Sequence, residues 1–91
     1  MTHEYVTTLA PEDVLSRAKE FFAERNPLYA AYPEKEGPSY LVLRGQGGEE
    51  VAFAVSQADG RTRIRASTLL FDQAVDRFLS TLPPAMAEAT R

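Results

Sequence analysis

Three arginines at alternate positions, Arg61, Arg63 and Arg65, are the residues of this sequence with the clearest potential for recognition chemistry. In an extended strand, residues two apart project from the same face, so the three guanidinium groups would form a row. Guanidinium groups bind carboxylates and phosphates through paired hydrogen bonds, and such a row therefore suits an acidic partner. The ordinary alternative is a solvated face on which Glu49 and Glu50 partly balance the charge.

A second group of residues combines phenols with carboxylates. Tyr29, Tyr32 and Tyr40 lie close in sequence to Glu34 and Glu36. A tyrosine that is hydrogen-bonded to a carboxylate can relay protons in acid–base catalysis. Amphipathic packing at a sheet edge explains the same pattern without any chemistry.

Groups for metal or covalent chemistry are scarce in this chain. It contains no cysteine and a single histidine, His3. A thiol-based zinc site and a cysteine nucleophile are therefore excluded, and no nucleophile–base pair stands at a diagnostic spacing. We expect a protein that is not an enzyme and that carries no cofactor and no metal.

Length and charge narrow the range further. The 91 residues suit one domain with a modest core, and the net charge of −3 disfavours a nucleic-acid partner. No apolar run approaches the length of about 20 residues that a membrane span needs. The segment Met1–Glu4 lacks the basic and apolar parts of a signal peptide. We expect a cytoplasmic protein without a membrane span.

The dipeptide Asp59-Gly60 is the strongest local structural signal. Two such residues supply the positive φ angles of a type I′ hairpin turn. With these two as the loop, Val55 pairs with Ile64 on one face and Ser56 pairs with Arg63 on the other. A slip by one residue would move the arginines into the core, so the register is strongly specified.

The glycine-rich turn at residues 45–48 leaves the register of its hairpin open. A loop of even length turns Leu41 and Leu43 outward beside Ala52 and Ala54, as a flat patch that another sheet or helix could approach. A loop of odd length turns the two leucines into the core. The sequence does not choose between the two.

Two amphipathic helices flank these strands. One is expected over residues 11–25, which open with a proline suited to the first helical position. A second is expected after Ser67 or Thr68 as the cap, with an apolar stripe that begins at Leu70 and extends over residues 70–82.

Two further strand candidates complete the order. Residues 3–9 form one, and residues 28–35 form either a strand that Pro33 confines to an edge or an irregular loop. The resulting order is β-α-β-β-β-β-α. It predicts an α+β fold of two layers, in which two helices cover one face of an antiparallel meander. Residues 1–82 would form this single domain, and residues 83–91 a flexible tail.

The strand at Tyr5–Leu9, the helix entry at Pro11–Val14, the Asp59-Gly60 hairpin and the helix at Leu70–Leu82 together resemble the TATA-binding-protein-like and helix-grip folds. The chain looks like a minimal relative of the START/polyketide-cyclase superfamily. Larger members of that superfamily cradle an apolar ligand between a curved sheet and a long C-terminal helix. This chain is much shorter and lacks the additional strands and helices that wall their pocket.

The resemblance implies an apolar pocket between the sheet and the helices. Its lining would be aromatic: Phe21, Phe22, Tyr40, Phe53, Phe71 and Phe78. The alternative is that these rings form a close-packed core, because a chain of this length has few side chains with which to line a void.

Three functions remain as hypotheses. The first is a non-catalytic binding or assembly domain, a homodimer or the binder of a protein partner, that uses the sheet face around Leu41, Leu43, Ala52, Ala54, Arg61, Arg63 and Arg65. The second is a carrier of a small apolar ligand. The third is nucleic-acid binding through the arginine-bearing face, which the acidic balance of the chain disfavours.

Overall fold

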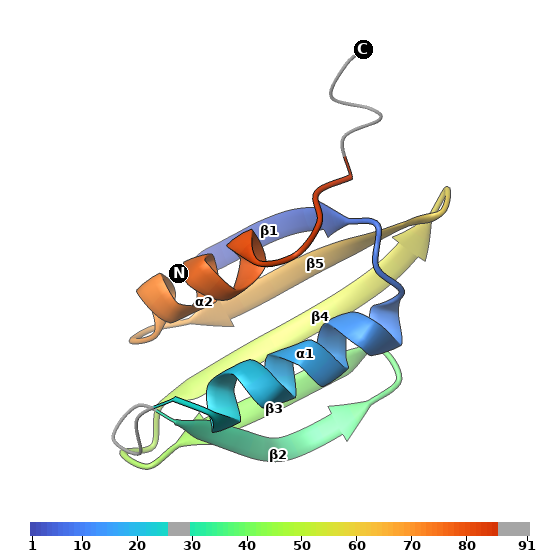
Figure 1. Cartoon of the computed structure of the whole chain (residues 1–91). Helices are drawn as coiled ribbons and strands as arrows, with labels where there is room; N and C mark the ends of the chain where they lie inside the picture. Colours follow the sequence, from blue (N-terminus) through green and yellow to red (C-terminus); the bar gives the residue numbers. More distant parts are fainter. Residues whose placement is uncertain (26–29, 86–91) are drawn as a thin grey trace.

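The computed structural model describes residues 1–25 and 30–85, and Figure 1 shows an α+β domain of two layers. The predicted fold class and the predicted order of elements are confirmed. The elements are β1 (Thr2–Thr7), α1 (Pro11–Ala23), β2 (Ala31–Gly37), β3 (Tyr40–Gly45), β4 (Glu50–Ala58), β5 (Arg61–Thr68) and α2 (Asp72–Ser80).

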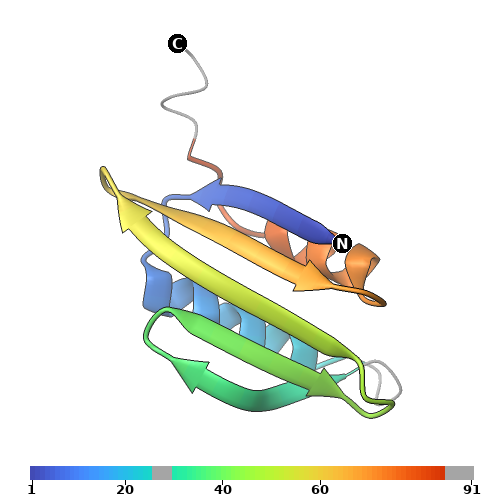
Figure 2. The same ribbon diagram turned by 180° about the vertical axis from the view of Figure 1, so that it is seen from behind.

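All five strands pair antiparallel in the order β1-β5-β4-β3-β2, so the N-terminal strand completes the sheet beside β5. Helix α1 packs against β2, β3 and β4, and α2 lies beside β1. Both helices cover the same face of the sheet (Figure 1), and the view from behind shows the other face without a helix (Figure 2). We call this uncovered side the open face.

The β4–β5 hairpin has the turn that its sequence predicts. Asp59 has a φ angle of 56° and Gly60 a φ angle of 75°, the positive values that a type I′ turn requires. Val55 pairs with Ile64, and Ser56 pairs with Arg63. The side chain of Ile64 is buried and that of Arg63 is exposed, so the predicted register is confirmed.

In the β3–β4 hairpin Arg44 pairs with Glu50, so an odd number of residues, 45–49, separates the paired positions, and this decides the open alternative. Leu41 pairs with Phe53 and Leu43 pairs with Val51, so both leucines point toward the helices and are fully buried. The backbone of the turn closes through a 2.7 Å hydrogen bond from Gly45 N to the Glu49 carbonyl. The outward placement of Leu41 and Leu43 is therefore wrong, and the two leucines belong to the core.

Strand β2 begins later than expected and runs through the charged residues. It spans Ala31–Gly37 at the sheet edge, and Pro33 lies in it as an edge strand permits. The pairing with β3 shifts between Pro33 and Lys35, which marks a bulge. Charged residues fit here because the edge strand is exposed, and residues 28 and 29 of the predicted strand lie outside the described residues.

Helix α2 is shorter than its apolar pattern suggested. It starts at Asp72, and Leu70 is 72% exposed, so the placement of Leu70 in the buried stripe is wrong. Thr68 still pairs with Val51 at the end of β5, and the chain needs the intervening residues to cross from the sheet to the helical layer. The hydroxyl of Thr68 accepts a 3.2 Å hydrogen bond from Phe71 N, which closes the turn before the helix.

The residues after α2 return to the sheet. Ala85 N donates a 3.0 Å hydrogen bond to the Val6 carbonyl, and the Thr7 hydroxyl donates a 2.6 Å hydrogen bond to the Pro83 carbonyl. Ala85 is buried. Residues 83–85 thus belong to the domain rather than to a tail, and residues 86–91 of the predicted tail lie outside the described residues.

The two faces of β3 predict opposite responses to truncation. Replacing the buried Leu41 with alanine should lower the free energy of unfolding by about 2–5 kcal/mol, because it leaves a cavity in the core. The same change at Val42, its neighbour on the open face, should cost about 1 kcal/mol or less. Urea denaturation of the two variants measures both values. A larger loss at Val42 than at Leu41 would contradict the observed register.

Candidate binding surface on the open face

The candidate functional site is the centre of the open face. Alternate residues of four neighbouring strands form it, because side chains on a strand alternate between the two faces of a sheet. Its members are Val6 on β1, Arg63 and Arg65 on β5, Ala52, Ala54 and Ser56 on β4, and Tyr40 and Val42 on β3. Ala52 and Ala54 were predicted to face outward and do so.

The centre of this surface carries small side chains on β4, and larger side chains flank them on β3 and β5. Ala52 and Ala54, on the central strand β4, have small side chains. On one side Tyr40 pairs with Ala54, and Tyr40 is 44% exposed. On the other side Arg65 pairs with Ala54. Tyr40, Ala54 and Arg65 therefore form one row across three strands.

Where β4 and β5 approach their hairpin turn, the open face is hollowed. The hollow has a volume of about 150 Å³ and lies beside the arginine row; its lining residues are Val6, Ser56, Ala58, Asp59, Arg61 and Arg63. It opens to solvent at the surface, so it suits a side chain of a partner better than a buried small molecule.

Two of the three arginines that the sequence singled out, Arg63 and Arg65, have guanidinium groups that are exposed to solvent. Arg63 and Arg65 are exposed on the open face, and neither forms an ion pair or a side-chain hydrogen bond within the described part of the chain. Arg61 is partly buried. The guanidinium groups of Arg63 and Arg65 thus lie on the open face without a salt bridge among the described residues.

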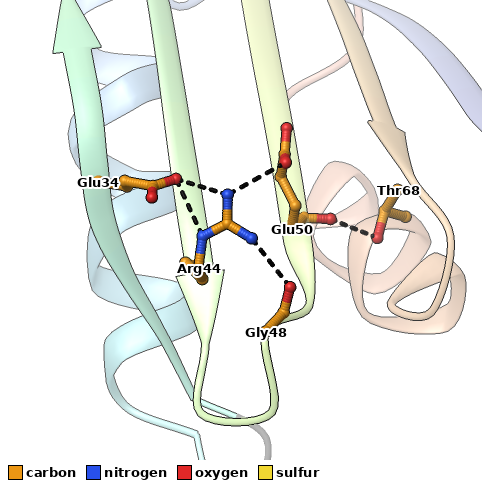
Figure 3. A network of polar contacts seen from close by, with 5 residues as sticks. All are labelled: Glu34, Arg44, Gly48, Glu50 and Thr68. Atoms are coloured by element: carbon orange, nitrogen blue, oxygen red, sulfur yellow. Dashed lines mark hydrogen bonds and ion pairs between the residues drawn. The ribbon is translucent and has the colours of Figure 1, made fainter.

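Arg44 is held in a network at the other end of the open face (Figure 3). Its Nε and Nη2 atoms donate hydrogen bonds of 3.0 and 2.8 Å to the same carboxylate oxygen of Glu34 on β2. Nη1 donates to the Gly48 carbonyl at 3.0 Å, and Nη2 reaches Glu50 on β4 at 3.3 Å. The network ties the edge strand β2, the β3–β4 turn and β4 together.

The electrostatics of this network follow from its geometry. The hydrogen bonds and the positive charge of Arg44 stabilise the ionised carboxylate and hold the pKa of Glu34 below its ordinary value. The hydrogen bond to Glu34 and its negative charge raise the pKa of Arg44. Arg44 is therefore neutralised by carboxylates that it contacts directly, whereas Arg63 and Arg65 form no such salt bridge among the described residues.

The predicted aromatic pocket is filled by its own side chains. Phe21 and Phe22 on α1 lie 5.2 Å apart between ring centroids, and Phe21 lies 5.5 Å from Phe78 on α2. Phe53 on the sheet lies 5.6 Å from Phe78. These are the distances of aromatic rings in packed contact.

Of the two remaining residues of the predicted pocket, one lies in the core and the other lies on the open face. Phe71 stacks with Phe22 at 6.3 Å and belongs to the same core. Tyr40 points from β3 into the open face, so its assignment to the pocket is wrong. The reason is the odd loop after β3, which exchanges the two faces of that strand.

The predicted tyrosine–carboxylate group separates in the structure. Glu34 binds Arg44, and Glu36 accepts a 2.9 Å hydrogen bond from Lys19 on the helical side. Tyr32 and Tyr40 are exposed, and Tyr29 lies outside the described residues. Among the described residues, the phenols of Tyr32 and Tyr40 thus have no carboxylate partner of the kind that proton transfer would need.

His3 has a structural partner. Its Nε2 lies 2.9 Å from the Asp72 carboxylate at the start of α2, and this hydrogen bond lowers the pKa of Asp72. Among residues 1–25 and 30–85, no group of three histidine or carboxylate side chains could hold a metal ion. The contact joins β1 to α2.

The Arg44–Glu34 pair is the feature that sequence reasoning missed. It joins strands β2 and β3 across the bulge, and the exact pairing of an irregular edge strand has no sequence signal. The exposure of Leu70 was missed as well, because its spacing fits the apolar stripe of the helix that follows.

No protein-family model, no curated protein and no solved structure gives a significant match to this chain. In the part of the chain that the structure describes, neither helix is long and apolar enough to cross a membrane.

Removing Arg44 should change how Glu34 titrates. In the Arg44→Gln variant the pKa of Glu34 should rise toward the ordinary glutamate value of about 4.3, because the hydrogen bonds and the positive charge are lost. In the wild type the ionised Glu34 carboxylate stabilises the folded state above about pH 4. This contribution is lost as the pH falls through the lowered pKa of Glu34 in the folded protein. Carbon-detected NMR titration of the Glu34 carboxyl measures the shift. Identical titration in both proteins would contradict the network.

Proposed function

We propose that this protein is a non-catalytic assembly domain that associates with a second copy of itself through the open face. The observation that carries the proposal is the composition of that face. Its centre holds Tyr40, Val42, Ala52 and Ala54, which are apolar or small, and no described element covers them. An apolar patch rimmed by polar side chains is typical of a protein interface.

The sheet edges are poorly suited to the same task. At one edge the bulge and Pro33 interrupt β2, and both features hinder strand addition. At the other edge, residues 83–85 occupy part of the hydrogen-bonding side of β1. Association through the face needs neither edge.

The size of the face limits the area that two copies can bury, and small interfaces are typical of weak, reversible association. Five strands spaced about 4.8 Å apart and about six residues of about 3.4 Å each give a footprint of about 24 by 20 Å. A pair of copies would then bury about 1,000 Å² in total, which is the lower limit for a specific interface. We therefore expect a reversible dimer with a dissociation constant in the micromolar range.

The two other hypotheses have less support. An apolar-ligand carrier needs a cavity, and the packed phenylalanine rings between sheet and helices argue against one. Nucleic-acid binding draws on the arginine row, but Glu4 stands directly opposite Arg65 on β1, and the net charge of the chain is −3. Charge repulsion from the acidic groups would weaken binding to phosphates.

Sedimentation of the protein over a range of concentrations tests the proposal. The wild type should pass from monomer to dimer between low and high micromolar concentrations. Ala52→Glu, which places a charge in the centre of the open face, should shift this transition at least tenfold upward, because two buried like charges would oppose each other. Ser16→Glu makes the same charge change at an exposed position of α1 and should leave the transition in place.

Two outcomes would overturn the proposal. One is a strict monomer at all concentrations. The other is a dimer that Ser16→Glu weakens as much as Ala52→Glu does. Circular dichroism of each variant establishes that the substituted chains are folded.

A further inference from the structure

We infer that the two copies pack sheet on sheet around a two-fold axis parallel to β4, so that Arg65 of each copy stacks on the partner's Tyr40. The inference rests on the proposed function and adds the orientation of the dimer and its specificity-determining contacts. It follows from how charged and aromatic side chains are distributed over the strands of the open face.

The pairing registers place four residues in one row across the sheet. Glu4 on β1 pairs with Arg65 on β5, Arg65 pairs with Ala54 on β4, and Ala54 pairs with Tyr40 on β3. Because β4 is the middle strand, β5 and β3 lie at equal distances on its two sides. A two-fold rotation about an axis along β4 exchanges these two sides, and each residue keeps its position along the strand direction. Arg65 then faces Tyr40 of the second copy, and the contact occurs twice.

The chemistry of this contact is favourable on both sides. Arg65 has no ion pair or side-chain hydrogen bond among the described residues, and Tyr40 is 44% exposed. A guanidinium group stacks well on an aromatic ring, and the attraction strengthens when water is excluded. The small side chains of Ala52 and Ala54 let the central strands approach to about 10 Å, the ordinary distance between packed sheets.

The other two-fold arrangement of the faces is disfavoured by charge. An axis perpendicular to the strands would lay β5 over β5, so that the arginine row with Arg63 and Arg65 would meet the same row of the second copy. It would also lay β1 over β1 and bring the two copies of Glu4 close together. Like charges in a desolvated interface repel each other strongly and disfavour this orientation.

The edge strands reinforce the choice. Lys35 on β2 pairs with Val42, so it points into the open face, and it lies one row from the level of Glu4. Rotation about the axis along β4 lays β1 of one copy over β2 of the other. Glu4 then lies diagonally opposite the partner's Lys35, which gives a second complementary pair at each end of the interface.

Cross-linking tests the orientation without altering the contact itself. Ser67, Ala52 and Val42 form the next row, so Ser67 of one copy should face Val42 of the other. The natural chain has no cysteine, and Ser67→Cys and Val42→Cys therefore each introduce a single thiol. With a short bis-maleimide, an equimolar mixture should give a covalent dimer in high yield, and each variant alone should give little.

The result that overturns the inference differs from the one that overturns the proposed function. A sedimenting dimer whose mixed variants do not cross-link, or whose single variants cross-link equally well, retains self-association and refutes this axis. A strict monomer refutes both.

A double-mutant cycle tests the stacking contact. Arg65→Gln and Tyr40→Leu should each weaken the dimer about 5- to 30-fold, because each removes two symmetric cation–π contacts. The double variant should weaken it little further, since the second change has no contact left to remove. Independent, multiplicative effects of the two substitutions in a sedimenting dimer would refute the contact.

Discussion

The division of the sheet into two unlike faces depends on the pairing of β4 with β5. The Asp59-Gly60 turn sets Val55 opposite Ile64, and every outward neighbour on β5 is then an arginine or a serine. Shifting the pairing by one residue would place Arg63 and Arg65 against the helices, where an unpaired charge is very costly to bury. The helical layer and the open face both follow from this one register.

On the covered face, aromatic rings pack together and join α1, α2 and the sheet. Phe21 and Phe22 of α1 meet Phe78 of α2, and Phe53 reaches them from the sheet. The buried hydroxyls of Thr7 and Thr62 also have partners, in the carbonyls of Pro83 and Leu9. Because the apolar sides of both helices pack on this face, the described part of the chain contains no element that covers the other face.

The open face carries its charge unevenly. At one end Arg44 contacts Glu34, Glu50 and a turn carbonyl, so its charge is balanced within the chain (Figure 3). Along β5 the charges of Arg63 and Arg65 are not balanced in this way. Tyr40 lies on the opposite side of the central strand from these arginines. Because the two sides of the open face differ in this way, one orientation of a partner is favoured over another.

The sequence by itself determined the α+β class, the order of elements and the β4–β5 register, because these depend on local periodicity and on a turn whose φ angles few residues tolerate. Only the tertiary structure decided which face Leu41 and Tyr40 occupy, since a glycine-rich loop accepts an odd or an even length and a single residue reverses the strand. The same holds for Leu70 and Glu34. Their surroundings come from segments distant in the chain, and local sequence carries no record of those contacts.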